Sequence, residues 1–122
     1  MNIVVVDDEE DIKLLFEYRF RKEIKNNNLI LHYFESVDDA IKFIIPNHNS
    51  IKCIFSDINM PNKDGFDLIR EIRTIGLNTK IVMVSAYSDR ANKDRSLESG
   101  ADGFVSKPIN FEMIRTILDL PK

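Results

Sequence analysis

Short apolar runs and amphipathic segments alternate along this chain. Five apolar runs rich in β-branched residues have the length and the continuous hydrophobicity of buried strands in a parallel sheet, and they cover residues 3–6, 29–34, 51–55, 80–84 and 103–106. Apolar residues recur near helical spacing in the segments that follow them. This pattern predicts helices over residues 12–24, 37–44, 66–75, 88–99 and 111–118.

Strands that alternate with helices predict one particular fold class. Parallel neighbours need right-handed crossover connections, so the helices must cover both faces of the sheet. We therefore expect an α/β, doubly wound, five-stranded parallel sheet with five helices, a flavodoxin-like three-layer sandwich. The segment 88–99 differs from the other helices because Ala91 and Leu97 are its only apolar residues, which predicts a weakly anchored helix.

Local signals mark several helix ends. Asp8 or Glu9 is placed to cap the first helix, and Ser36 followed by Asp39 resembles a capping motif for the second. Gly76 stands where the third helix should stop.

Composition narrows the possible functions. The chain has 122 residues, 43% of them hydrophobic and 30% charged, which predicts one domain over residues 1–122. A formal charge of -3 and the absence of a basic run argue against nucleic acid and acidic membrane surfaces as partners. Because Cys53 is the single cysteine, an intramolecular disulfide is excluded. We expect Cys53 to be a buried thiol. We find neither a long apolar run nor a leader pattern, so we expect a cytoplasmic location.

Polar residues follow the predicted strands at their carboxyl ends. Asp7 and Asp8 follow the first strand, Asp57 the third, Ser85 the fourth and Lys107 the fifth. Open parallel sheets bind ligands beyond the carboxyl ends of their strands. This coincidence predicts a functional site that contains all five residues.

Each of these residues also has a simpler interpretation when it is taken alone. The acidic run from Asp7 is suited to a helix N-terminus, and Asp57 precedes a Pro/Asn/Gly loop as a turn residue would. Ser85 alone indicates a strand-end hydroxyl with a local hydrogen bond, and Lys107 alone indicates a solvated surface charge. His32 and His48 have no metal-ligand spacing and are assigned to a strand surface and a loop.

Taken together, these motifs resemble the receiver domain of two-component response regulators. The resemblance rests on residues 6–9 (VDDE), 56–61 (SDINMP), 64–65 (DG), 84–86 (VSA), 100–104 (GADGF) and 107–108 (KP), and it covers nearly the whole chain. It implies the strand order 2-1-3-4-5, the order of flavodoxin-like sheets such as those of chemotaxis receivers. It also implies a cis peptide bond between Lys107 and Pro108.

The resemblance implies a Mg²⁺ site and a phosphoacceptor. Asp8 is expected to ligate the ion directly, Asp7 through water, Asp57 as a further ligand and as the nucleophile, and Asn59 through its main-chain carbonyl. Elementary electrostatics agrees, because carboxylates about 5 Å apart repel by about 3 kcal/mol per pair at an effective dielectric constant of about 20. Clustered carboxylates are also ligands that suit Mg²⁺.

The same resemblance assigns roles to three further residues. Lys107 is expected to contact the transferred phosphoryl oxygens, while Ser85 and Phe104 form the switch. Phe104 stands where the family often has Tyr, so a hydroxyl contact to a partner is lost. The implied partners are a histidine kinase or phosphotransfer protein and a downstream protein or second copy. The latter would bind the face made by residues 88–99, 103–106 and 111–118.

Two other functions are considered. A Mg²⁺-dependent phosphohydrolase of the haloacid-dehalogenase type places a second acid two residues after its nucleophile, and Asn59 breaks that motif. A receiver fold that acts without phosphorylation is disfavoured by the intact acidic, hydroxyl and lysine positions. Asn59 and Tyr87 flank the expected approach of water, and a bulky Tyr87 is expected to slow loss of the phosphoryl group.

Overall fold

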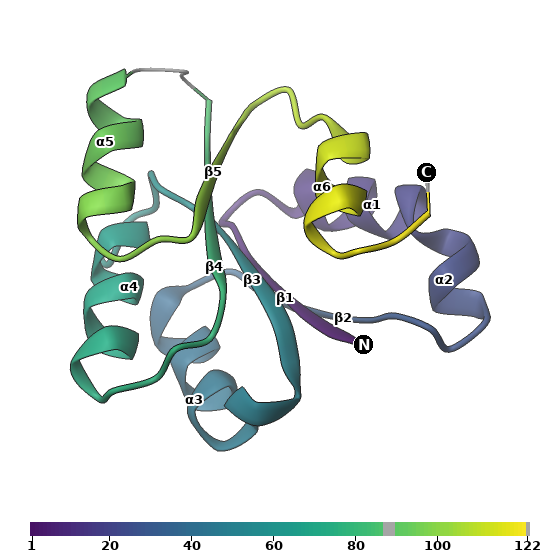
Figure 1. Cartoon of the computed structure of the whole chain (residues 1–122), viewed down its shortest axis with the longest axis horizontal. Helices are drawn as coiled ribbons and strands as arrows, with labels where there is room; N and C mark the ends of the chain where they lie inside the picture. The colour runs from purple at the N-terminus through teal and green to yellow at the C-terminus, as the bar shows by residue number, and fades with distance from the viewer. Residues whose placement is uncertain (87–89, 122) are drawn as a thin grey trace.

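A five-stranded parallel sheet forms the centre of the protein in the computed structural model, which describes residues 1–86 and 90–121 (Figure 1). Its strands lie in the order β2-β1-β3-β4-β5. They are β1 (Asn2–Val6), β2 (Ile30–Phe34), β3 (Ile51–Asp57), β4 (Ile81–Ser85) and β5 (Gly103–Ser106). The fold class and the strand order predicted from the sequence are confirmed.

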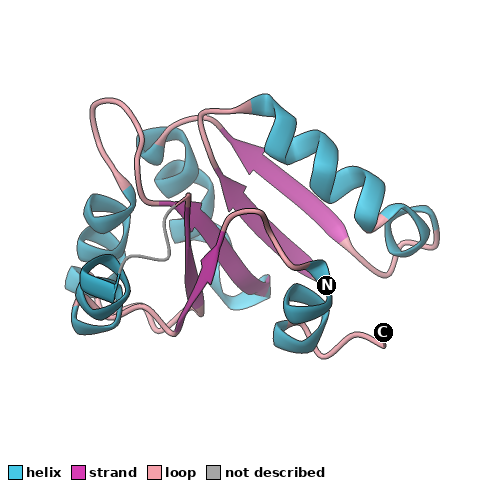
Figure 2. Ribbon diagram, turned by 90° about the horizontal axis from the view of Figure 1, so that it is seen from above, coloured by secondary structure: helices cyan, strands magenta, loops and turns pink. Residues whose placement is uncertain are grey.

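Helices cover both faces of the sheet (Figure 2). They are α1 (Glu10–Arg19), α2 (Arg21–Lys25), α3 (Val37–Asn47), α4 (Gly65–Thr74), α5 (Arg90–Glu98) and α6 (Phe111–Ile117), with a short 3-10 turn at His48–Ser50. The expected count of five helices is wrong, because the first predicted helix is divided at Phe20. The backbone at Phe20 has φ -108° and ψ 21°, and its fully buried ring packs between Phe16 and Phe111.

Alternate residues of each strand enter two separate cores, as the period of two in a strand requires. Val4, Val6 and Ile54 face one core, which α3 and α4 complete. Ile3, Val5 and Phe55 face the other, which α1 and α6 complete. Because both faces of the central strands are apolar and buried, polar side chains are confined to the strand ends.

The helix ends differ in part from the sequence predictions. Neither Asp8 nor Glu9 caps α1 through its side chain; instead the Asp7 carboxylate accepts a hydrogen bond from the Glu9 N–H at 2.8 Å. This geometry leaves Asp8 exposed. Ser36 caps α3 by accepting from the Asp39 N–H, as expected. Gly76, with φ +86°, follows the end of α4.

Helix α5 is attached mainly at its C-terminal end. Ser96 is its only buried residue among those of the helix itself, in agreement with the expectation of weak anchoring. Arg73 on α4 donates to the carbonyl of Gly100 just beyond α5, and also to the carbonyls of Leu77 and Thr79 and to the Asp102 carboxylate. Within the described ranges, no helix is long and apolar enough to cross a membrane.

Candidate functional site

Three carboxylates meet at the carboxyl edge of the sheet. Asp7 and Asp8 directly follow β1, and Asp57 is the last residue of β3. Since Val6 pairs with Ser56 in the parallel register, both strands end at the same level. Ligand oxygens of the three side chains lie within 4.8 Å of one another, with Asp7 and Asp57 buried and Asp8 exposed.

Lys107 joins this cluster from the end of β5. Its Nζ lies 3.2 Å from Asp7 Oδ2 and 3.7 Å from Asp57 Oδ2. The peptide bond to Pro108 is cis, as expected from the sequence. Burial acts to lower the pKa of Lys107, but the charges of Asp57 and Asp7 outweigh it and hold that pKa above its ordinary value. The lysine is therefore a permanent cation beside the two buried carboxylates.

The two buried carboxylates are harder to ionise than ordinary aspartates. Burial raises the pKa of Asp57 to about 6, and the negative charge of Asp7 adds to the effect, while Lys107 and the Asn59 N–H oppose it. Burial also raises the pKa of Asp7, against hydrogen bonds from the Glu9 N–H and Lys107. Burial thus raises the pKa of both carboxyl groups by more than the charge of Lys107 lowers it, so the site favours additional positive charge.

The other residues expected in the site lie in its neighbourhood. Val84 pairs with Asp57, so Ser85 is one residue beyond that level on the next strand, and it is fully buried. Asn59 is exposed, and its main-chain N–H bonds to the Asp57 carboxylate. Phe104 lies one strand further away on β5 and is half-buried. Tyr87 lies outside the described residues.

Two residues of the site were not predicted as such from the sequence. The hydroxyl of Tyr33 on β2 donates to the main-chain carbonyl of Asp7 at 2.6 Å. Burial, with nearby carboxylates, raises the pKa of Tyr33 to about 12, so the phenol keeps its proton. Gly65 begins α4 against the site, and a Cβ there would meet the Met83 side chain and lie 2.5 Å from the Asp57 carbonyl oxygen.

The remaining polar residues of interest lie elsewhere. Cys53 is buried, and burial raises its thiol pKa to about 12, in agreement with an inert thiol. His32 Nε2 lies 3.0 Å from the Asn2 side-chain oxygen, with its ring packed on Phe43, and His48 lies in the 3-10 turn. Both histidines are therefore outside the acidic cluster.

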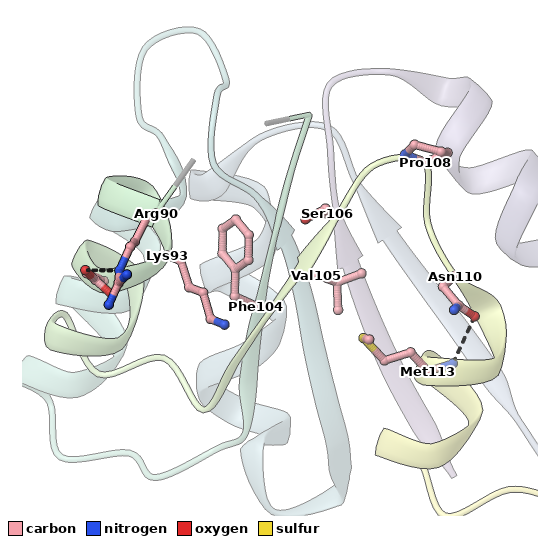
Figure 3. A pocket seen from close by; sticks show the side chains of 9 residues that line it. Arg90, Lys93, Phe104, Val105, Ser106, Pro108, Asn110 and Met113 are labelled. Carbon is pink, nitrogen blue, oxygen red and sulfur yellow. Dashed lines mark hydrogen bonds and ion pairs between the residues drawn. The ribbon is translucent and has the colours of Figure 1, made fainter. Parts of the chain in front are cut away.

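A second surface feature adjoins β5. A cavity of about 660 Å³ lies between α5 and α6, and Phe104 lines it on the α5 side while Met113 lines it on the α6 side (Figure 3). Arg90 and Lys93 bring positive charge from α5. Met113 is 47% exposed, which gives this face both apolar and charged contact area.

The acidic cluster fits a hard divalent cation. The oxygens of three carboxylates lie close together, and Lys107 contacts the two buried ones, Asp7 and Asp57. Both buried carboxylates resist ionisation in the absence of further positive charge. Mg²⁺ prefers oxygen ligands and is commonly held by a few carboxylates together with water or phosphate. A nucleophilic carboxylate beside a cation site is suited to phosphoryl transfer.

Comparison with known proteins assigns this sheet and its acidic edge to a class of signalling domain. The family model of the response regulator receiver domain matches residues 3–119. The chain belongs to this family, the phosphoacceptor domains of two-component phosphorelays.

Individual relatives show the same relationship. The chain is 40% identical to the sensor histidine kinase RcsC of Escherichia coli K12 over 67% of the chain, which is 8% of that protein. It is 30% identical to the yeast osmosensing histidine protein kinase SLN1 over 96% of the chain, which is 11% of that protein. The chain thus spans about a tenth of the length of these kinases.

Solved structures agree on the fold. The Francisella response regulator 1452 receiver domain is 26% identical with a TM-score of 0.81, and the match covers 97% of this chain and 93% of that one. The Vibrio cholerae chemotaxis protein CheY4 is 21% identical with a TM-score of 0.79; that match covers 98% of both chains and supports the fold alone.

Proposed function

We propose that Asp57 accepts a phosphoryl group from a phosphohistidine of a histidine kinase or phosphotransfer protein. The observation that carries this proposal is the position of a buried aspartate within 4.8 Å of two further carboxylates and 3.7 Å from a lysine. At neutral pH a carboxyl group with a pKa of about 6 is mostly ionised, which is the form that attacks phosphorus.

Asp7, Asp8 and Asp57 are proposed to hold Mg²⁺, with the main-chain carbonyl of Asn59 as a further ligand. When bound, the ion neutralises the carboxylates and the incoming phosphoryl oxygens. Asp8 is suited to direct ligation because it is exposed next to two buried acids. Asp7 already accepts hydrogen bonds from the Glu9 N–H and Lys107, so ligation through water is suited to it.

The transfer itself needs little chemistry from other side chains. An oxygen of Asp57 forms a bond to phosphorus as the bond from phosphorus to the donor imidazole nitrogen breaks, and the electron pair stays on that imidazole. Lys107 moves from carboxylate contacts to a phosphoryl oxygen, and the Ser85 hydroxyl donates to another. The chain thereby assists its own phosphorylation and dephosphorylation without acting on an external substrate.

Phosphorylation is proposed to change the surface formed by α5, β5 and α6. Ser85 and Phe104 are the switch residues, because one ends β4 beside the acceptor strand and the other borders the cavity on that surface (Figure 3). New contacts made only in the phosphorylated state shift a two-state equilibrium. A downstream protein or a second copy of the chain binds there, and amide hydrogen exchange of residues 90–98 should change on phosphorylation.

One experiment tests the acceptor directly. The protein is incubated with Mg²⁺ and a small phosphodonor, and its intact mass is compared with that of Asp57→Asn. A stable phosphoryl adduct in the wild type alone supports the proposal, and the absence of any adduct favours an interaction module that works without phosphorylation. Continuous phosphate release from external substrates would favour a phosphohydrolase, whose second acid is replaced here by Asn59.

A further inference from the structure

The main chain of Asp7 is held at the end of β2 by two hydrogen bonds. Its N–H donates to the carbonyl of Phe34 at 3.1 Å, and its carbonyl accepts from the Tyr33 hydroxyl at 2.6 Å. The first bond continues the ladder between β1 and β2. The second comes from a side chain 26 residues away and acts on the peptide that joins Asp7 to Asp8.

That peptide determines where the Asp8 side chain begins. Asp8 is exposed, and its carboxylate lies within 4.8 Å of two other carboxylates that repel it. Like charges at this separation repel one another, and the repulsion favours movement of the exposed Asp8 side chain toward solvent. Rotation of the Asp7–Asp8 peptide is a direct way for Asp8 to leave the cluster, and it would break the Tyr33 hydrogen bond.

We propose that Tyr33 is a positioning residue that keeps Asp8 in place for divalent cation binding. The inference rests on the proposed Mg²⁺ site and adds to it a residue from the edge strand. Preorganised ligands bind an ion more tightly because less ordering remains to be done on binding. The phenol ring has a separate role, since it packs against the core beside α1 and lies 5.9 Å below Lys13 Nζ.

The substitution Tyr33→Phe separates the hydroxyl from the ring. Tyr18→Phe is a matched control, because Tyr18 is 62% exposed on α1 and its ring lies 4.5 Å from the Arg21 guanidinium. Both variants lose one hydroxyl and keep an aromatic ring. The Mg²⁺ dissociation constant of each is measured by isothermal titration calorimetry, at a temperature where circular dichroism shows every protein fully folded.

We expect Tyr33→Phe to weaken Mg²⁺ binding by about three- to tenfold, the range of one intramolecular hydrogen bond, and Tyr18→Phe to leave it unchanged. Phosphoryl adduct formation should need more Mg²⁺ for half-saturation in Tyr33→Phe yet reach the wild-type level at saturation. A merely structural hydroxyl would lower stability in EDTA without moving either Mg²⁺ response.

Equal Mg²⁺ affinity in Tyr33→Phe and wild type overturns the role of Tyr33, as does equal weakening in both tyrosine variants. Failure of the wild type to bind Mg²⁺ removes the metal site itself, so the two failures are distinguishable. If Tyr33→Phe is partly unfolded, all three proteins are titrated in the same stabilising osmolyte, which restores the folded state.

Discussion

Asp57→Asn should make the metal-free protein more stable at neutral pH. Burial raises the pKa of Asp57 from 3.8 to about 6, so ionising this carboxyl group is harder in the folded chain than in the unfolded one. A difference of about 2 pKa units corresponds to about 3 kcal/mol of lost stability at pH 7.5. An asparagine side chain at this position has the same shape and no charge to desolvate, so the variant should recover up to this amount.

The sign of the pH dependence follows from the raised pKa of Asp57. Between pH 3.8 and about 6 the folded protein retains the Asp57 proton while the unfolded chain has lost it. This carboxyl group therefore costs nothing below the unfolded pKa; its cost grows between pH 3.8 and about 6 and is constant at higher pH. The advantage of Asp57→Asn should fall to about half at pH 5 compared with its value at pH 7.5.

The measurement is urea unfolding in EDTA, followed by far-ultraviolet circular dichroism because the chain has no Trp. Glu17→Gln is the control, since Glu17 is exposed in the middle of α1 and its change should stay within about 0.5 kcal/mol. If Asp57→Asn is no more stable than wild type at pH 7.5, burial of the ionised Asp57 carboxylate does not destabilise the fold. A gain that is equally large at pH 5 would show that its source is not the charge.

Three further changes test other parts of the site and its support. Lys107→Met removes the cation from the acidic cluster and should slow adduct formation from a small phosphodonor by about 10-fold or more, the value of a charged hydrogen bond, as intact mass against time will show. Gly65→Ala should lower the free energy of unfolding by about 1–3 kcal/mol, because the added methyl group overpacks the site. Gly103→Ala is the control and should cost less, because a Cβ at Gly103 makes only ordinary contacts. Urea unfolding compares the two variants. Arg73→Ala removes hydrogen bonds to three carbonyls and a carboxylate and should lower the free energy of unfolding by about 2–4 kcal/mol in the same assay. Arg70→Ala is the control, because the Arg70 side chain is 67% exposed. An equal decrease in both variants would contradict the prediction.

The sequence predicts the sheet and the positions of the site residues for one physical reason. Strands buried on both faces must be apolar throughout, so a polar residue such as Asp57 can enter only where the strand stops. Because the strands are parallel, their carboxyl ends lie at one edge of the sheet. Asp7, Asp57 and Lys107 can therefore be assigned to one site from the sequence alone.

The features that the sequence does not predict depend on exact approach distances. Tyr33 has the pattern of an ordinary strand residue, and its contact with Asp7 becomes visible only when the register of β1 and β2 is known. The first helix is divided at Phe20, whose ring contacts Phe16 and Phe111, and the helical spacing of apolar residues does not show this break. The side-chain cap expected from Asp8 or Glu9 does not form; the Asp7 carboxylate instead accepts a hydrogen bond from the Glu9 N–H, just before the helix begins.

The scarcity of buried residues on α5 has a consequence for how receiver surfaces diversify. Helix α5 buries one side chain, that of Ser96, and a hydrogen bond from Arg73 holds the chain at Gly100 just beyond it. The other side chains of α5 add little to the core. Substitutions at exposed positions of this kind usually change stability by less than about 0.5 kcal/mol. Residues such as Lys93 and Asp94 can therefore be exchanged at little cost in stability while the acidic site and the sheet stay intact.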